Sequence, residues 1–300
     1  MLHKDREIFE DILLRVSVEY GIDAAIIEKD YYVTLLLKNI AELVPEIIFK
    51  GGTSLSKCYR LIERFSEDID LSIFEEVKPP ESRRRRLKEG IFKAIEISEL
   101  TLENKDDIRS RRDFNRYVIA YPSVFTSSAV KPKLIVETAV FTGIYPTEIG
   151  TVGNYIFDYL SKNNALDFVD TSSIIPFQIK VQKPERTFVD KVFALCDYHL
   201  AGSHEQHSRH IYDIYRLFGI IKIDESLKEL IEKVRKERKS LQMCPSAQDG
   251  VDINALLEEI IGKDAYKADY NNTTYRLLFK KVPYEEVVET LKKISKPRIF

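Results

Sequence analysis

The chain has 300 residues, of which 44% are hydrophobic, and its 46 Lys and Arg nearly balance its 48 Asp and Glu, for a net charge of −2. This balance excludes a general nucleic-acid binder, so any RNA contact must come from a local basic patch. No apolar run is long enough to cross a membrane, no signal peptide opens the chain, and three widely separated cysteines indicate no disulfide framework. We therefore expect a cytoplasmic protein with no membrane partner.

Residues 4–43 have the apolar spacing of two helices. Phe9, Ile12, Leu13 and Val16 recur at helical intervals, and Gly21 is placed to end the first helix. The second helix is strongly apolar and carries little basic surface, which argues against a helix-turn-helix DNA reader. We expect both helices to pack across the back of the sheet that follows.

The stretch from Ile47 to Phe74 predicts a strand, a turn, a helix and a second strand. Ile47–Lys50 is a short apolar run of strand type, and Gly51–Ser54 is a small polar break. An amphipathic helix is expected over Leu55–Arg64, and a strand over Ser66–Phe74.

Alternation within this second strand separates apolar from acidic side chains. Ile69, Leu71 and Ile73 share one face, so Asp68 and Asp70 lie together on the other. Two carboxylates one residue apart repel each other unless a cation lies between them. Mg²⁺ prefers such hard oxygen ligands and completes its coordination shell with substrate phosphates. The strand therefore predicts a divalent-metal site.

The polar break before the helix predicts phosphate contacts. Gly51 and Gly52 let the backbone approach a ligand closely, and the N–H groups of a helix N-terminus bind phosphate. Thr53 and Ser54 add hydroxyl groups at the same place. A Gly-Gly turn is usually only a turn, and a D-x-D strand is often a solvated face. Together and in this order, the two motifs favour nucleotidyl transfer.

A basic segment follows, from Lys78 to Arg116, with twelve Lys and Arg against eight Asp and Glu. One interpretation is a solvated helix face, which is the usual fate of a charge run. The other is a phosphate-binding rim for an RNA backbone, because clustered arginines gain from counterion release. The sequence alone leaves the two interpretations even.

Glu137 is a lone acid in the strongly apolar strand predicted over Lys131–Phe141, where it shares a face with Lys133 and Ile135. Burying a carboxylate without a partner costs several kcal/mol. A salt bridge is the simple explanation, and a third metal-facing carboxylate is the alternative, which the family resemblance described below favours.

Two later helices carry further candidates. Over Pro184–Leu195, Lys191 lies at the edge of an apolar stripe, where its long stem could reach toward a cleft. Taken alone, this position favours a surface lysine bridged to a nearby acid. In the second helix, Asp213 has Arg209 four residues before it and Arg216 three after it, which is also the spacing of a local ion-pair array.

Four of the five histidines, His199, His204, His207 and His210, fall within twelve residues between these two helices. A zinc site must be considered, but no carboxylate or cysteine accompanies them at a recognised spacing. A mobile loop over Gly202–Ser208 is the preferred interpretation.

Several of these motifs, in order, resemble one family. G-G-T-S-L-x-K-x-Y and R-F-S-x-D-I-D-L are similar to motifs of the AbiEii-type toxins of type IV toxin–antitoxin systems. These toxins belong to the nucleotidyltransferase superfamily typified by DNA polymerase beta. I-E-K-D-Y-Y-V-T, P-E-R-T-F-x-x-K and R-x-x-Y-D-I-Y-R-L resemble further motifs of the same group.

The resemblance implies an α+β, bilobed fold, with a mixed-sheet nucleotidyltransferase core over residues 1–182 and a mostly helical lobe over residues 183–300. It implies that Asp68 and Asp70, with Glu137, hold Mg²⁺ or Mn²⁺. Lys57 and Lys191 would add positive charge for the triphosphate, and Asp213 would lie by the nucleotide.

The activity implied is transfer of an NMP from an NTP to RNA, with the 3′ end of tRNA as acceptor, in a protein that has a cognate antitoxin encoded nearby. Two alternatives stay open. The acceptor could be a protein hydroxyl or a small molecule, or the protein could be a nucleotide-binding regulator without turnover.

Overall fold

The computed structural model describes residues 1–66, 68–75, 79–125, 130–142, 146–241 and 244–300. The chain divides into two compact units. The first unit contains Met1–Arg60 and Ser66–Gln182, and the second contains Leu61–Phe65 and Lys183–Phe300. The short segment Leu61–Phe65 is an excursion that the sequence-based division at residue 182 does not anticipate.

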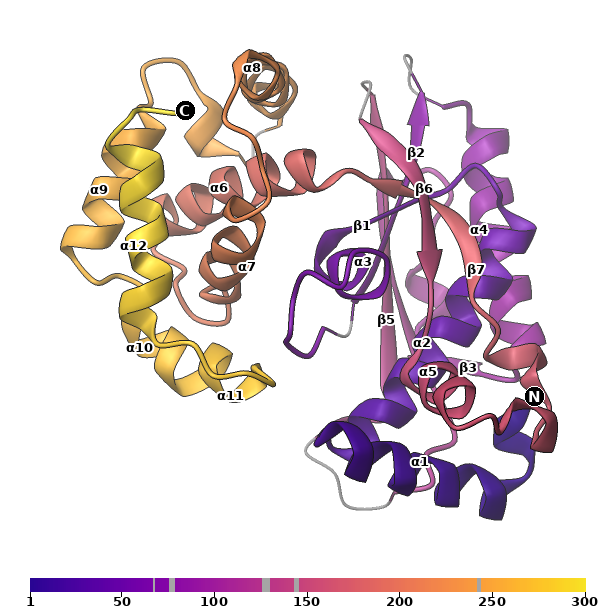
Figure 1. The fold of residues 1–300 in the computed structure, drawn as a ribbon. Coiled ribbons are helices and arrows are strands. Elements are labelled where there is room, and N and C mark those ends of the chain that lie inside the picture. The colour runs from indigo at the N-terminus through magenta and orange to yellow at the C-terminus, as the bar shows by residue number, and fades with distance from the viewer. Residues whose placement is uncertain (67, 76–78, 126–129, 143–145, 242–243) are drawn as a thin grey trace. The chain divides into compact units, whose positions relative to one another are not determined.

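The first unit is built on a seven-stranded mixed sheet in the order β3-β4-β5-β2-β1-β7-β6 (Figure 1). β2 runs parallel to β5 and antiparallel to β1, and β1 runs parallel to β7. This sheet confirms the predicted mixed α and β class. The strands are β1 Ile48–Lys50, β2 Asp68–Glu75, β3 Thr101–Leu102, β4 Phe114–Ala120, β5 Lys133–Thr142, β6 Thr147–Val152 and β7 Phe177–Gln182.

The helices of the first unit begin with the two that the sequence predicts. Asp5 caps the first by accepting from the N–H of Ile8, and Gly21 ends it with a left-handed φ of 63°. The helices are α1 Arg6–Tyr20, α2 Ala24–Leu43, α3 Gly51–Lys57, α4 Glu81–Ile97 and α5 Tyr155–Lys162. Short 3₁₀ turns lie at Leu2–Lys4, Lys105–Asp107, Leu166–Phe168 and Thr171–Ser173.

The apolar face of β2 lies in the core of this unit. Ile69, Leu71 and Ile73 are fully buried in one cluster with apolar side chains of α2 and α4, as the alternation predicts. Figure 1 shows α2 and α4 packed together beside the sheet. Because successive strand residues point to opposite faces, this burial directs Asp68 and Asp70 away from the core.

The predicted helix over Leu55–Arg64 is wrong. α3 instead begins at Gly51 and ends at Lys57, and Arg60 adopts a left-handed φ of 52°. Arg64 then forms an isolated antiparallel bridge with Leu278. This bridge needs an extended backbone, so contacts within the second unit override the helical pattern of the segment.

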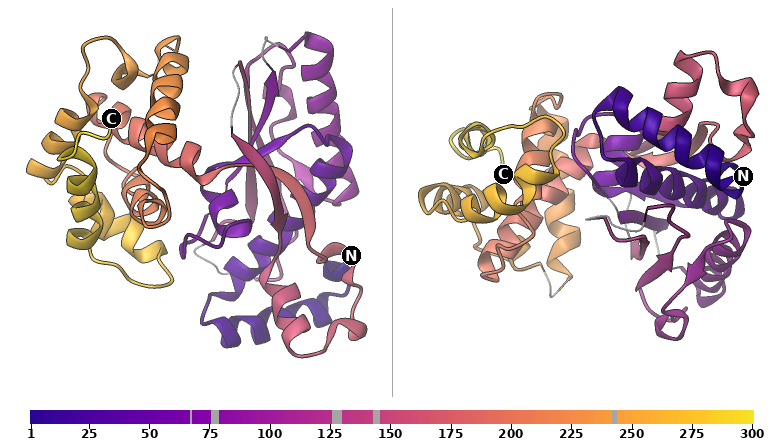
Figure 2. Two further views of the ribbon diagram at one scale, coloured as in Figure 1. Left: turned by 45° about the horizontal axis from the view of Figure 1, so that its top comes forward. Right: turned by 90° about the horizontal axis from the view of Figure 1, so that it is seen from below.

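The rest of the second unit, over its described residues from 183 onward, consists of helices and turns (Figure 2). Its longest helix, α6, buries Phe188, Val192 and Leu195 completely, as the apolar stripe predicts. The helices are α6 Pro184–Leu200, α7 Arg209–Phe218, α8 Glu225–Lys239, α9 Ile253–Gly262, α10 Lys267–Asp269, α11 Tyr275–Leu277 and α12 Tyr284–Ser295, with a 3₁₀ turn at Pro245–Ala247 and a π turn at Tyr270–Thr274.

Among all the residues that the structure describes, no helix has the length and hydropathy needed to cross a membrane.

Candidate active site

A row of four charged residues crosses the sheet on the face opposite the core. The strand register pairs Lys50 of β1 with Asp70 of β2, Asp70 with Glu137 of β5, and Glu137 with Arg116 of β4. Side chains at paired positions point to the same face of a sheet. Two carboxylates therefore lie side by side at the middle of the row, with a cationic residue at each end.

Gly51 brings the start of α3 against this row. Its φ is +76°, and a Cβ built on it would lie 1.9 Å from Oδ2 of Asp70. The Asp70 carboxylate thus occupies the space that any other side chain at position 51 would need. The Gly-Gly turn and the D-x-D strand, which the sequence linked by their order alone, are in direct contact.

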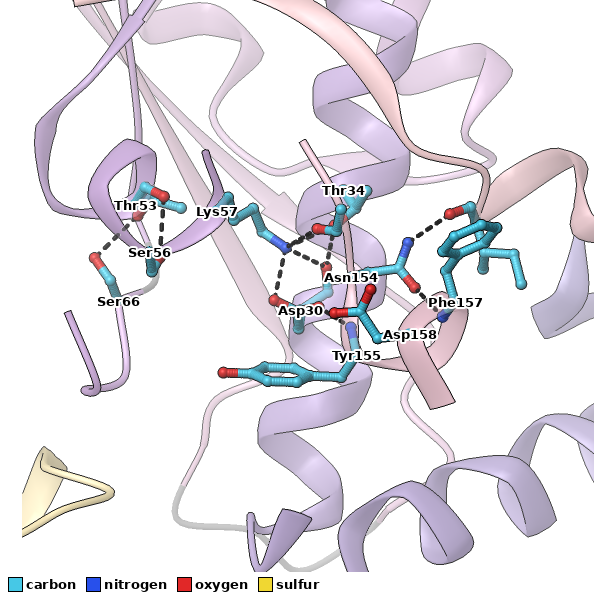
Figure 3. A network of polar contacts seen from close by, with 12 residues as sticks. Asp30, Thr34, Thr53, Ser56, Lys57, Ser66, Asn154, Tyr155, Phe157 and Asp158 are labelled. Carbon is cyan, nitrogen blue, oxygen red and sulfur yellow. Dashed lines mark hydrogen bonds and ion pairs between the residues drawn. The ribbon is translucent and has the colours of Figure 1, made fainter. Parts of the chain in front are cut away.

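The hydroxyl groups beside Gly51 are engaged within the first unit. Ser54 Oγ donates to the Gly51 carbonyl at 2.9 Å, and Thr53 Oγ1 lies 2.9 Å from Ser66 Oγ (Figure 3). Both residues are buried. The Thr53–Ser66 bond ties the start of α3 to the residue at which the chain re-enters the first unit before β2.

Glu137 carries the salt bridge that its sequence context suggests. Its Oε1 lies 3.4 Å from Nε of Arg116, and the two side chains are 32% and 56% exposed. A pair this exposed contributes little to stability. The salt bridge explains the acid, but it does not exclude a metal-facing role for the same carboxylate.

Carboxylate oxygens from two neighbouring strands are the chemistry that Mg²⁺ or Mn²⁺ takes. In this respect Asp68, Asp70 and Glu137 fit a divalent cation. In the part of the chain that the structure describes, no three His, Cys, Asp or Glu side chains are grouped as for a metal ion. The three-carboxylate metal set therefore stays a prediction.

Lys57 is buried and held inside the first unit. Its Nζ lies 2.6 Å from Asp30 Oδ1, 2.7 Å from Thr34 Oγ1 and 3.3 Å from the Asp30 carbonyl (Figure 3). The Gly153 carbonyl lies 3.4 Å away. An ammonium group has three donors, and acceptors within the first unit suffice for all of them. The contacts favour an anchoring role for Lys57, which joins α3 to α2, over the direct phosphate contact expected from the sequence.

Lys191 and Asp213 lie together in the second unit. Nζ of Lys191 is 2.6 Å from Oδ2 of Asp213, and the same carboxylate accepts two bonds of 2.7 Å from Arg64. Burial alone would raise the pKa of Asp213, but the charges of Arg64 and Lys191 outweigh it and hold that pKa below its usual range. Asp213 is therefore a buried, ionised group, and its place beside the nucleotide stays a prediction.

The four clustered histidines make contacts with one another and with aromatic rings. His199 Nδ1 lies 3.0 Å from His204 Nε2, and His207 stacks on Tyr198 with ring centroids 3.5 Å apart. Burial lowers the pKa of His207 and lowers that of His210 much further. These rings therefore stay neutral near pH 7 and add no charge beside Lys191.

The arginines of the basic segment form ion pairs within the first unit. Arg84 pairs with Asp113 at 3.1 Å, and Arg83 and Arg86 approach Glu46 at 4.0 and 3.8 Å. The side chains of Arg85 and Arg86 are still 63% and 64% exposed. Both interpretations of this segment survive; Lys78, at its start, lies outside the described residues.

Sequence reasoning missed three partners of the candidate residues. Arg64 and Asp30 stand inside motifs that we quoted, yet neither was given a role, because burial cannot be read from a motif. Arg116 was counted only as part of the basic segment. The signal that could have identified it is the strand register, which depends on long-range pairing.

Replacing Gly51 with alanine tests the contact between the two motifs. We expect Gly51→Ala to lower the free energy of unfolding by about 1–2 kcal/mol for the left-handed backbone. The collision with Asp70 should add about 1–3 kcal/mol. Urea denaturation followed by circular dichroism measures the loss. Gly21→Ala is the matched control, because Gly21 also has a left-handed φ but a Cβ added there would meet nothing within 4 Å; equal losses in both variants would contradict the contact.

Replacing Lys57 with methionine tests the anchor. Lys57→Met leaves the Asp30 carboxylate, only 16% exposed, without its cation. We expect a loss of about 3 kcal/mol in the free energy of unfolding, as for other broken buried pairs. Arg60→Met is the control, because Arg60 pairs with Asp158 while 73% exposed and should cost less than about 1 kcal/mol. A Lys57→Met protein as stable as the control would show that the anchor is unimportant.

Comparisons with known proteins assign the chain to a fold and a family. No match is found among curated proteins. A search of solved structures finds MenT4, a nucleotidyltransferase toxin from Mycobacterium tuberculosis H37Rv, with a TM-score of 0.62 and 15% sequence identity over 95% of this chain and 89% of that chain. At this identity the likeness concerns the fold.

The family model described as "Nucleotidyl transferase AbiEii toxin, Type IV TA system" matches residues 35–290. That range includes the charged row, Gly51, Lys57, and the group formed by Lys191 and Asp213. The chain therefore belongs to the AbiEii family of nucleotidyltransferase toxins of type IV toxin–antitoxin systems.

Proposed function

We propose that this protein transfers an NMP from an NTP to RNA, with the 3′ end of tRNA as acceptor. The observation that carries the proposal is the contact between Gly51 and Asp70, because it joins a backbone turn suited to phosphate with paired carboxylates suited to a cation. Membership of the family supports the reaction class.

In the reaction, an acceptor hydroxyl attacks the α-phosphate in line. A new phosphorus–oxygen bond forms, the bond between the α-phosphate and its bridging oxygen breaks, and pyrophosphate leaves with that bridging oxygen. Asp68 and Asp70, with Glu137, would hold Mg²⁺ or Mn²⁺. When bound, the cation neutralises phosphate charge and lowers the pKa of the attacking hydroxyl.

The chain's own groups orient the triphosphate in this proposal. Backbone N–H groups from Gly52 to Ser54 point toward the β- and γ-phosphates, and Lys191 supplies a positive charge. Lys57 fixes α3 to α2 through Asp30, which keeps the turn in place. Asp213 holds the ammonium group of Lys191 by the ion pair at 2.6 Å.

The acceptor is the least constrained part of the proposal. The exposed Arg85 and Arg86 of α4 favour RNA as the acceptor, since they can contact its phosphates without breaking a buried ion pair. These arginines also have acidic partners within the first unit, which agrees with an ordinary solvated helix face. A hydroxyl group of a protein is therefore a second candidate acceptor. A cognate antitoxin, which the type IV family description implies, would be the partner that limits the activity.

The metal assignment predicts the effect of Asp70→Asn. Purified protein, Mg²⁺ and each labelled NTP would be incubated in turn with total tRNA. We expect labelling of tRNA to fall on the order of 100-fold or more in Asp70→Asn, because a charged group that stabilises the transition state is lost. EDTA should abolish labelling of tRNA by the wild type, and added Mg²⁺ or Mn²⁺ should restore it.

Asp158→Asn is the matched control, since Asp158 also lies in the first unit but pairs with exposed Arg60. Full tRNA labelling in Asp70→Asn would contradict the metal assignment. Label on protein in place of tRNA would favour the second acceptor, and stable NTP binding without any product would favour a regulator without turnover.

Charge reversal in α4 tests the RNA rim. We expect Arg85→Glu with Arg86→Glu to weaken tRNA labelling about tenfold or more at moderate salt and to flatten its dependence on salt concentration, because fewer counterions are released. Lys162→Glu is the control, as Lys162 is equally exposed in the first unit and pairs with Glu19. An equal loss in both variants would contradict a specific rim.

A further inference from the structure

The excursion Leu61–Phe65 is fixed to the second unit by its backbone. Arg64 bridges Leu278, Phe65 N–H donates to the Leu277 carbonyl at 3.1 Å, and Phe279 N–H donates to the Glu63 carbonyl at 2.8 Å. These bonds hold the segment extended alongside residues 277–279, at the end of α11. Along this extended segment the side chains of Ile62 and Arg64 are both buried.

Of these two buried side chains, Arg64 carries a charge. Its Nε donates to Oδ1 of Asp213 and its Nη2 donates to Oδ2, both at 2.7 Å. Oδ2 is also the oxygen that Lys191 approaches at 2.6 Å. The side chains of Arg64, Asp213 and Lys191 are 2%, 0% and 9% exposed. One carboxylate therefore has a cation on each side, with little water to screen either pair.

The geometry separates the contributions of the two cations. A guanidinium is a planar fork that fixes both the plane and the direction of a carboxylate, whereas an ammonium is a point charge on a flexible stem. With Lys191 alone, the Asp213 carboxylate could turn about its own bond. With Arg64 in place, Oδ2 faces Lys191 in one orientation.

Electrostatics agrees with this division. Burial lowers the pKa of Lys191 and the permanent charge of Arg64 lowers it further, against the opposite effect of Asp213. Two further groups act on this cluster: Arg209, which also lowers the pKa of Lys191, and His210, whose pKa burial holds well below its usual range.

We propose that Arg64 is a positioning residue for the transfer reaction, because its fork fixes the carboxylate of Asp213, which in turn holds the ammonium group of Lys191 for the triphosphate. The inference rests on the proposed function and extends it to a residue that does not touch substrate. Arg64 also lies four residues before Asp68 in the chain. The excursion is therefore continuous in sequence with β2, which carries Asp68 and Asp70.

The chain offers a matched control in Arg216. It lies on α7, as Asp213 does, and pairs with Glu63 of the same excursion at 2.6 Å, with side chains 27% and 45% exposed. The pair joins the same two elements without involving Asp213 or Lys191. A purely structural role of Arg64, as an anchor of the excursion, would be shared by Arg216.

The experiment compares Arg64→Met, Arg64→Lys and Arg216→Met in the full-length protein. One readout is the KM for the NTP and the kcat of transfer. The other, which needs no transfer, is the reactivity of the Lys191 amine toward acetic anhydride as a function of pH, measured by mass spectrometry. Thermal unfolding shows which variants are folded.

For Arg64→Met we expect the pH at which Lys191 reacts to rise by about one unit or more, since a permanent neighbouring charge is removed. For Arg64→Lys, which keeps a positive charge but loses the fork, we expect this pH to stay near that of the wild type. In both variants the KM for the NTP should rise about tenfold, the effect of one lost charge-assisted hydrogen bond, while Arg216→Met stays near the wild type.

Equal changes in the Arg64 and Arg216 variants would overturn the proposal, as would a folded Arg64→Lys protein with an unchanged KM. If Arg64→Met does not fold, the KM of the Arg64→Lys protein for the NTP still tests the proposal. If the wild type transfers no nucleotide, the proposed function fails, and the Lys191 reactivity then decides alone whether Arg64 acts on the lysine. Unchanged reactivity in a folded Arg64→Met protein would show that it does not.

Discussion

The carboxylate of Asp70 occupies the space that a side chain at position 51 would need, and this constraint fixes how the start of α3 lies against β2. A glycine with a left-handed φ is the one residue type that fits there at low cost. The strand must bury Ile69 and Leu71 on its other face, so Asp70 has no alternative direction. Packing on one side of the sheet thereby determines the chemistry on the other.

Charge in this protein is arranged by depth. At the sheet surface, Glu137 and Arg116 form a loose, half-exposed pair that water screens and that a ligand can displace at little cost. In the interior, Lys57 pairs with Asp30 and Arg64 pairs with Asp213. These side chains are largely shielded from water, so breaking either pair costs several kcal/mol. The buried pairs therefore suit a structural role, whereas the half-exposed pair can open when a ligand binds.

The sequence was sufficient for what depends on local pattern. Alternation predicted the buried face of β2, apolar spacing predicted α6, and Gly21 after the apolar run predicted the end of α1. The sequence did not predict structure that depends on contacts between distant segments. The helix expected through Arg64 gives way to an extended segment because Leu278, more than two hundred residues later, pairs with it. Likewise, Lys57 has a motif position but its partner Asp30 belongs to another helix. The metal set and the nucleotide roles remain predictions.

The excursion Leu61–Phe65 also determines how the chain can be divided. The backbone passes between the two units at residues 60/61, 65/66 and 182/183. A fragment ending at residue 182 would carry Arg64 without the buried carboxylate that compensates its charge. A fragment beginning at residue 183 would leave Leu278 without its bridge partner. A single cut in the chain therefore does not separate the two units. An exchange of the second unit between relatives would have to include Leu61–Phe65 together with the C-terminal part.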